Sequence, residues 1–145
     1  MIGFVIAIIS GISMSLQGIF NTKLGQKIGV WETNVFVQAS ALLITLIVLF
    51  FFGDGDFKNI KTVNKVYLIS GVLSVIIIFT VMKSISSLGT TVGIGTILIA
   101  QITTAALIDA FGLFGNEKIS FGPSEVLGII IMIAGIVLFE WKFWY

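Results

Sequence analysis

The sequence contains no cysteine and no histidine, and it has little charge of either sign. Without these residues the chain has no disulfide framework, thiol nucleophile, zinc finger or imidazole base. Only 10% of its 145 residues are charged, whereas a soluble domain carries roughly a quarter. So few charges cannot cover a surface that faces water, which excludes an ordinary soluble enzyme.

The net charge and the hydrophobicity of the chain exclude further classes of protein. A net charge of +1 offers no basic surface of the kind that binds nucleic acid. Hydrophobic residues make up 57% of the chain and the mean hydropathy is +1.15, which excludes intrinsic disorder. The long uncharged runs that remain are typical of an all-α integral membrane protein, in which each helix pairs its own backbone groups within lipid.

Apolar runs predict five transmembrane helices in a single domain over residues 1–145. A crossing takes about 20 residues, and the predicted helices cover residues 2–22, 31–52, 66–84, 91–114 and 123–143. The fifth run is the weakest, because its uncharged part extends only from Val126 to Phe139. An aromatic belt at the membrane interface is expected after it, at Trp141, Trp144 and Tyr145. Five crossings place the two termini on opposite sides of the membrane.

The one clearly hydrophilic stretch, residues 53–65, is predicted to be a loop, because it combines Gly/Asp turn signals with three lysines. Asp54 and Asp56 within it could also begin a calcium loop. The stretch lacks the further oxygen ligands and the terminal Glu of such a loop. We therefore expect a turn there, and neither a metal ion nor an organic cofactor in the chain.

The lysines divide evenly between the two sides of the predicted bundle. One side carries Lys58, Lys61, Lys65 and Lys118, and the other carries Lys23, Lys27, Lys83 and Lys142. An excess of Lys and Arg normally fixes the cytoplasmic side, and no excess exists here. The balance favours insertion in both orientations and an antiparallel homodimer. The alternatives are an even split by chance or one early loop that dominates the orientation.

Polar side chains inside the predicted helices are candidates for a solute or ion pathway, because polar groups at membrane depth tend to face a cavity or a bundle interior. They form three pairs: Gln17 with Asn21, Asn34 with Gln38, and Gln101 with Asp109. For the amides the alternative is a set of interhelical hydrogen bonds, worth about 0.6–2 kcal/mol each. Asp109 would bind a cation or a proton, or else be held by a lysine at the interface. Small residues at four-residue spacing, Ala7, Gly11 and Ser15, predict close helix packing.

The fourth predicted helix carries the run Ala100-Gln-Ile-Thr-Thr-Ala-Ala-Leu-Ile-Asp-Ala-Phe-Gly-Leu-Phe-Gly115, which resembles the signature "GQ…iDhfGl.g" of the YdcZ-type inner-membrane family. The first and fifth helices agree with that family at Gly11, Gln17, Asn21, Leu24, Gly25, Leu127, Gly128 and Gly135. Two positions depart from it. Ala100 stands where the family usually has Gly, and Ala110 stands where it often has His. The second departure removes a titrating neighbour of Asp109.

The resemblance covers nearly the whole chain and implies membership of the drug/metabolite transporter superfamily in the bacterial inner membrane. It also implies small chains that insert in both orientations or pair with an oppositely oriented homologue. An antiparallel homodimer would then form a ten-helix transporter with inverted repeats. The resemblance does not extend to the helix 1 carboxylate of the small multidrug resistance proteins, because Gln17 is the polar residue there.

The sequence thus predicts a secondary transporter that exports a small metabolite or drug-like solute by alternating access at a dimer interface. Its partners would be a second copy or a homologue, the lipid bilayer and the solute. A small dual-topology ion channel is the alternative, because amides and the 13 phenylalanines could line a narrow pore. An accessory subunit without transport is a third possibility. Nothing in the sequence indicates an enzyme.

Overall fold

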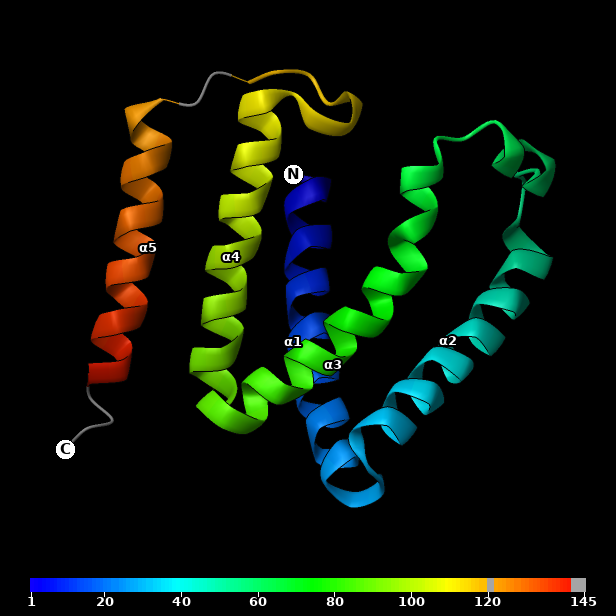
Figure 1. The fold of residues 1–145 in the computed structure, drawn as a ribbon, viewed down its shortest axis with the longest axis horizontal. Coiled ribbons are helices and arrows are strands. Elements are labelled where there is room, and N and C mark those ends of the chain that lie inside the picture. The colour runs from blue at the N-terminus through cyan, green and yellow to red at the C-terminus, as the bar shows by residue number, and fades with distance from the viewer. Residues whose placement is uncertain (120–121, 142–145) are drawn as a thin grey trace. The chain divides into compact units, whose positions relative to one another are not determined.

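The computed structural model describes residues 1–119 and 122–141, and its regular elements are all helical. The α-helices are α1 (Ile2–Ile28), α2 (Val30–Phe52), α3 (Ser70–Leu88), α4 (Thr90–Phe111) and α5 (Pro123–Trp141). Short 3₁₀ turns lie between them: η1 (Phe57–Lys61), η2 (Lys65–Ile69) and η3 (Leu113–Gly115). The predicted all-α fold with five helices is confirmed (Figure 1).

Four of these helices are long and apolar enough to cross a membrane. They are α1, α2, α4 and the segment Lys65–Leu88, in which η2 leads into α3. The apolar part of α5 within the described residues, Pro123–Phe139, is shorter than these four. The fifth crossing therefore stays a prediction. Residues 142–145, with the end of the predicted fifth helix and with Trp144 and Tyr145, lie outside the described residues.

The predicted end of the first helix is too early. α1 continues from residue 22 to Ile28 and includes Lys23 and Lys27, which lie between the first two predicted helices. Lysine is a good helix former, and its cation is favourable near a helix C-terminus. The edge of an apolar run marks where a helix leaves lipid, and the helix itself continues beyond it.

The other boundaries also move for local reasons. The predicted third helix, 66–84, becomes η2 followed by α3, which ends at Leu88. The fourth helix ends at Phe111 and not at 114, because Gly112 adopts the left-handed conformation (φ 63°, ψ 39°). Gly is the residue that ends helices in this way most often.

Single glycines separate α1 from α2 and α3 from α4. Gly29 has φ 102° and ψ 154°, and Gly89 has φ 79° and ψ 168°. Both lie in a region of backbone space that is essentially restricted to glycine. The chain therefore passes between consecutive helices with one residue where the sequence predicts loops of several residues.

The chain divides into two compact units, residues 1–86 and 87–145. In the first unit α1 and α2 contact each other and diverge from the turn at Gly29 that joins them (Figure 1). Most of α3 belongs to the same unit and buries Ile78, Met82 and Ile85. A Cβ at Gly18 would lie 2.9 Å from Ile85 Cδ1. The α3 side chains thus pack directly on the backbone of α1.

In the second unit α4 and α5 pack against each other (Figure 1). Ile136 of α5 lies on Gly95 of α4, where a Cβ would be 2.8 Å from Ile136 Cδ1. The first turn of α5 is closed by Glu125, whose carboxylate accepts hydrogen bonds from Gly122 N (2.9 Å) and Ser124 Oγ (3.0 Å). An acidic side chain at this position also stabilises the positive end of the helix dipole.

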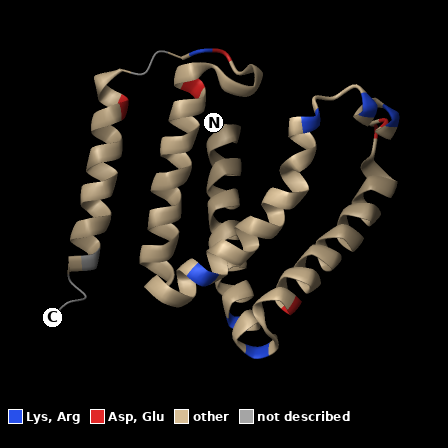
Figure 2. Cartoon of the chain, in the orientation of Figure 1, with Lys and Arg blue, Asp and Glu red and all other residues tan. Residues whose placement is uncertain are grey.

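Charged residues lie at the helix ends and in the connections, and the helix middles are free of charge over the described residues (Figure 2). The loop between α2 and α3 holds Lys58, Lys61 and Lys65, and it is stabilised locally. Asp56 Oδ1 accepts a hydrogen bond from Lys58 N (2.8 Å), and Asn64 Oδ1 accepts one from Val66 N (3.1 Å). Asp56 and Asn64 therefore stabilise the turn that the sequence predicts.

Candidate functional site

The polar residues that the sequence singles out are distributed over both units. Gln17 and Asn21 lie on α1, and Asn34 and Gln38 lie on α2. Gln101 and Asp109 lie on α4. They also differ in exposure: Asn21 and Asn34 are buried, Gln38 and Asp109 are half-buried, and Gln17 and Gln101 are exposed. They therefore do not form one cluster of equivalent groups.

Asn34 and Gln38 join α2 to α3. Asn34 is 3% exposed, and its Nδ2 donates a hydrogen bond to Val75 O at 2.9 Å. One turn further along, Gln38 Nε2 donates to Ser74 Oγ at 2.8 Å. These two amides make the interhelical contacts that were the alternative to a pathway role.

Aromatic stacking extends the same seam between α2 and α3. The rings of Trp31 and Phe79 are stacked, with centroids 4.9 Å apart and an interplanar angle of 16°. Trp31, Asn34 and Gln38 are spaced by three and four residues and therefore share one face of α2. This face of α2 holds α3 by ring stacking at Trp31 and by hydrogen bonds at Asn34 and Gln38.

Asn21 is 7% exposed and lies beside the contact between α1 and α3. Its neighbour Thr22 is also buried, and Thr22 Oγ1 donates to Gly18 O at 2.8 Å. The Asn21 carboxamide forms no hydrogen bond with the residues that the structure describes. No fully buried side-chain N or O atom in that part of the chain lacks a partner. The carboxamide of Asn21 is therefore partly accessible at the surface of its unit.

Gln17 and Gln101 lie near the middle of α1 and of α4, respectively, and both are exposed within their units. Over the described residues neither side chain has a hydrogen-bond partner. A carboxamide left unpaired in hydrocarbon costs several kcal/mol, roughly 2–7 by transfer scales. A membrane-inserted chain therefore has to present these two amides to other protein or to water.

Asp109 lies in the last turn of α4 and interacts with the segment that follows. Its backbone carbonyl accepts hydrogen bonds from Gly112 N (3.3 Å) and Ile119 N (3.0 Å). Asn116 Nδ2 approaches the carboxylate Oδ1 at 3.5 Å. The half-buried carboxylate thus belongs to the helix end and its loop, and it is removed from the mid-helix position of Gln101.

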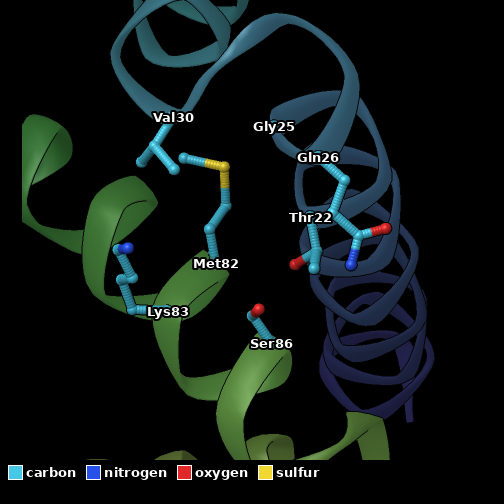
Figure 3. Close-up of a pocket in the computed structure, with 7 residues that line it drawn as sticks. All are labelled: Thr22, Gly25, Gln26, Val30, Met82, Lys83 and Ser86. Carbon is cyan, nitrogen blue, oxygen red and sulfur yellow. The ribbon is translucent and has the colours of Figure 1, made fainter.

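A pocket of about 70 Å³ lies between the C-terminal turns of α1 and α3. Figure 3 shows the hydroxyls of Thr22 and Ser86 turned toward it, with Met82 and Lys83 on the α3 side. Met82 is only 2% exposed and is in contact with the backbone of α1 at Gly25, where a Cβ would lie 3.3 Å from Met82 Sδ. The described residues include no group of three or more His, Asp or Glu side chains that could hold a metal ion.

Sequence reasoning missed the α3 partners of these groups, Ser74, Val75 and Met82. It also placed the close-packed stripe of α1 at Ala7, Gly11 and Ser15, whereas a Cβ at Gly11 would meet nothing within 4 Å. The packed positions are Gly18, Thr22 and Gly25. They continue the same stripe at spacings of four and three, so the signal was present in the sequence further along the helix.

A family model described as "Putative inner membrane exporter, YdcZ" matches residues 2–138, which is nearly the whole chain. No curated protein and no solved structure matches the sequence.

Proposed function

Because the chain belongs to the YdcZ family of inner membrane proteins, we propose that it exports a small metabolite or drug-like solute by alternating access. The active form is an antiparallel homodimer, or a pair with an oppositely oriented homologue. Each chain contributes one transmembrane domain of five crossings over residues 1–145. Two antiparallel copies of an odd-helix chain generate inverted repeats from one sequence, which is the symmetry that places transporter sites near the bilayer midplane.

The unpaired carboxamides of Gln17 and Gln101 carry this proposal. Each lies near the middle of its helix and is exposed in its own unit. Their polarity is costly in lipid and useful in a solute pathway, where an amide donates and accepts hydrogen bonds without adding charge. Gln17 and Gln101 therefore line the pathway at mid-membrane depth, and Asn21 lies toward one end of it.

The remaining candidates have different roles in this proposal. Asn34 and Gln38 hold α3 against α2 through the hydrogen bonds to Val75 O and Ser74 Oγ. They keep the wall of the pathway together and do not bind the solute directly. Asp109, at the end of α4, binds the coupling proton or cation as it enters or leaves.

The experiment starts from purified protein in detergent, screened by thermal shift against metabolites and drug-like cations. A solute that raises the unfolding midpoint is then tested for flux in proteoliposomes. We expect saturable flux that falls at least tenfold in Gln17→Leu and Gln101→Leu. The matched control is Thr45→Val, because the Thr45 hydroxyl is exposed and bonds only within α2, to Ala41 O at 2.7 Å.

Two results would contradict the proposal. Flux that rises in proportion to concentration without saturation, at rates far above a conformational cycle, would identify an ion channel. Full flux in both glutamine variants would remove these amides from the pathway.

A further inference from the structure

The connection between α2 and α3 leaves apolar side chains exposed. Phe57 is 73% exposed and Ile60 is 49% exposed. Both belong to η1, and the Phe57 ring makes no aromatic contact with the residues that the structure describes. In a 3₁₀-helix, side chains three residues apart lie on the same side of the turn. Phe57 and Ile60 therefore form one apolar side of η1.

Lysines occupy the neighbouring side of the same turn. Lys58 and Lys61 are again three residues apart, so they share the side next to the apolar one. Lys65 follows at the start of η2, and residues 57–69 contain no Asp or Glu. None of these three lysines forms an ion pair within the described part of the chain. The segment thus combines an apolar side with a cationic side.

Hydrogen bonds within the connection hold η1 in this register. Asp56 Oδ1 accepts a hydrogen bond from Lys58 N at 2.8 Å and closes the first turn of η1. At the other end, Asn59 O accepts hydrogen bonds from Thr62 N at 3.0 Å and from Thr62 Oγ1 at 2.7 Å. The apolar and cationic sides are therefore set by the fold of the connection itself.

The ends of η1 are tethered to two apolar segments. Val30–Phe52 before it and Lys65–Leu88 after it are both long and apolar enough to cross a membrane. An extended chain spans at most about 3.6 Å per residue, so η1 starts within about 18 Å of Phe52 and ends within about 14 Å of Lys65. Phospholipid headgroups occupy the layer just outside such apolar segments. That layer is therefore within reach of η1.

We propose that η1 lies in the headgroup layer and binds the surface of an anionic phospholipid bilayer. The side with Phe57 and Ile60 enters the boundary between headgroups and acyl chains, and Lys58, Lys61 and Lys65 contact the lipid phosphates. A free anion would engage the lysines and leave the apolar side in water, whereas a lipid surface engages both sides. The inference does not rest on the proposed transport, because it involves none of the residues assigned to the pathway.

Spin labelling of the full-length protein tests this placement, because the chain contains no cysteine. Ile60→Cys puts a nitroxide on the apolar side of η1, and Asn59→Cys puts one on the side that holds neither Phe57 nor a lysine. Each protein is reconstituted in vesicles of phosphatidylcholine and phosphatidylglycerol. Power saturation then compares collisions with oxygen, which concentrates in lipid, and with a nickel chelate, which stays in water. We expect the ratio of oxygen to nickel collisions to be several-fold higher at position 60 than at position 59.

The lysines and the ring are tested separately, with the label at position 60. Each lysine near an anionic surface changes the ratio of bound to unbound η1 about fivefold. Lys58→Gln and Lys61→Gln in one chain should therefore lower that ratio about 25-fold. Vesicles of phosphatidylcholine alone should lower it in the chain that keeps its lysines. Phe57→Ser, with all lysines in place, should lower it about tenfold. The matched control is Lys27→Gln, which removes an exposed lysine from the last turn of α1 and should change nothing.

Three results would overturn the proposal. Equal nickel contact at positions 59 and 60 in both kinds of vesicle would show that η1 lies in water. A label at position 60 that neither reagent reaches would show that protein, such as a second copy of the chain, covers the apolar side. Oxygen contact at position 60 that is unchanged by phosphatidylglycerol and by loss of the two lysines would show that η1 does not recognise anionic lipid.

Discussion

At the scale of single residues, hydrogen bonding separates polar groups that hold the structure from polar groups that are free to act. Asn34 and Gln38 are engaged with α3, at 2.9 Å and 2.8 Å. Gln17 and Gln101 have no partner in the part of the chain that is described. Side chains of the same chemistry therefore serve two purposes. A substitution at each is expected to change a different measured quantity.

A double-mutant cycle between Gln38→Leu and Ser74→Ala tests the engaged group. We expect a coupling free energy of about 0.6–1.7 kcal/mol, the range found for interhelical hydrogen bonds in membranes. The coupling is obtained from the free energies of unfolding of the unaltered chain, the two single variants and the double variant, each measured in bicelles by steric trapping. The control cycle pairs Gln17→Leu with Ser74→Ala and should be additive within about 0.5 kcal/mol. Equal coupling in both cycles would show that the Gln38–Ser74 bond does not hold α3.

The carboxylate of Asp109 is tested by Asp109→Asn, which keeps the shape and removes the charge. The backbone hydrogen bonds at this helix end, from Gly112 N and Ile119 N to Asp109 O, do not need the carboxylate. We therefore expect the variant to fold and insert in normal amounts and to lose the dependence of flux on the pH gradient. The readout is flux in proteoliposomes with and without that gradient. Normal pH dependence in the variant would exclude Asp109 as the coupling group, and failure to insert would make it an anchor of the loop.

Residue types were predictable from sequence in a way that their partners were not. The cost of polar groups in lipid was enough to select Gln17, Asn34 and Gln38 as significant. Ser74 and Val75 lie 36 and 41 residues away from their partners on α2. No local pattern encodes a contact at that separation, because it depends on how α3 packs in the first unit.

At the scale of helices, two glycines determine how the apolar segments are connected. Gly29 and Gly89 each stand alone between two long helices. Both have backbone angles that residues with a Cβ rarely adopt. A connection of one residue between two helices cannot absorb a change in backbone conformation, so a substitution at either glycine affects the positions of both helices that it joins.

Substitution of the glycine between α1 and α2 should be costly. Gly29→Ala would force a Cβ into this conformation and against the Glu32 carboxylate. We expect a loss of about 1–3 kcal/mol in the free energy of unfolding. The matched control is Gly11→Ala in the middle of α1, where a Cβ meets nothing within 4 Å. Alanine is the better helix former there, by about 0.5–1 kcal/mol, so stability should be unchanged or higher. The same loss of unfolding free energy at both positions would show that backbone strain at Gly29 is not the cause of the destabilisation.

Apolar runs predicted the existence of all five helices and missed several of their ends. Hydropathy reports which residues lie in lipid, whereas helix ends depend on backbone hydrogen bonding and on residues such as Gly29 and Gly112. Lys23 and Lys27 illustrate the difference, because both are polar and both are helical. The single-residue connections could have been suspected from the glycines. The alternative of a longer loop was equally compatible with the sequence.

At the scale of the whole molecule, the distribution of lysine bears on how the chain inserts. The four lysines before α3 and after α4 are matched by four at the opposite helix ends and near the C-terminus. Orientation in a membrane follows the excess of Lys and Arg on one side. With no excess, one added charge is a large fraction of the signal, and the proposed antiparallel dimer depends on this near balance.

The last prediction uses that sensitivity. Gly55 is exposed in the loop between α2 and α3, and a Cβ there meets nothing within 4 Å, so Gly55→Lys adds a charge without disturbing packing. The unaltered chain should place this loop on either side of the membrane in similar amounts. Gly55→Lys should shift most copies toward the orientation in which the loop is cytoplasmic. Gly55→Gln is the uncharged control and should keep the mixture of orientations.

The absence of cysteine makes the measurement of orientation direct, because a single Cys at Asn59 can be labelled from outside intact cells and again after lysis. Transport should fall with the shift, because fewer antiparallel pairs can form, and it should recover when an oppositely biased copy is co-expressed. Labelling from one side only in the unaltered chain would exclude the homodimer and require an oppositely oriented homologue as the partner.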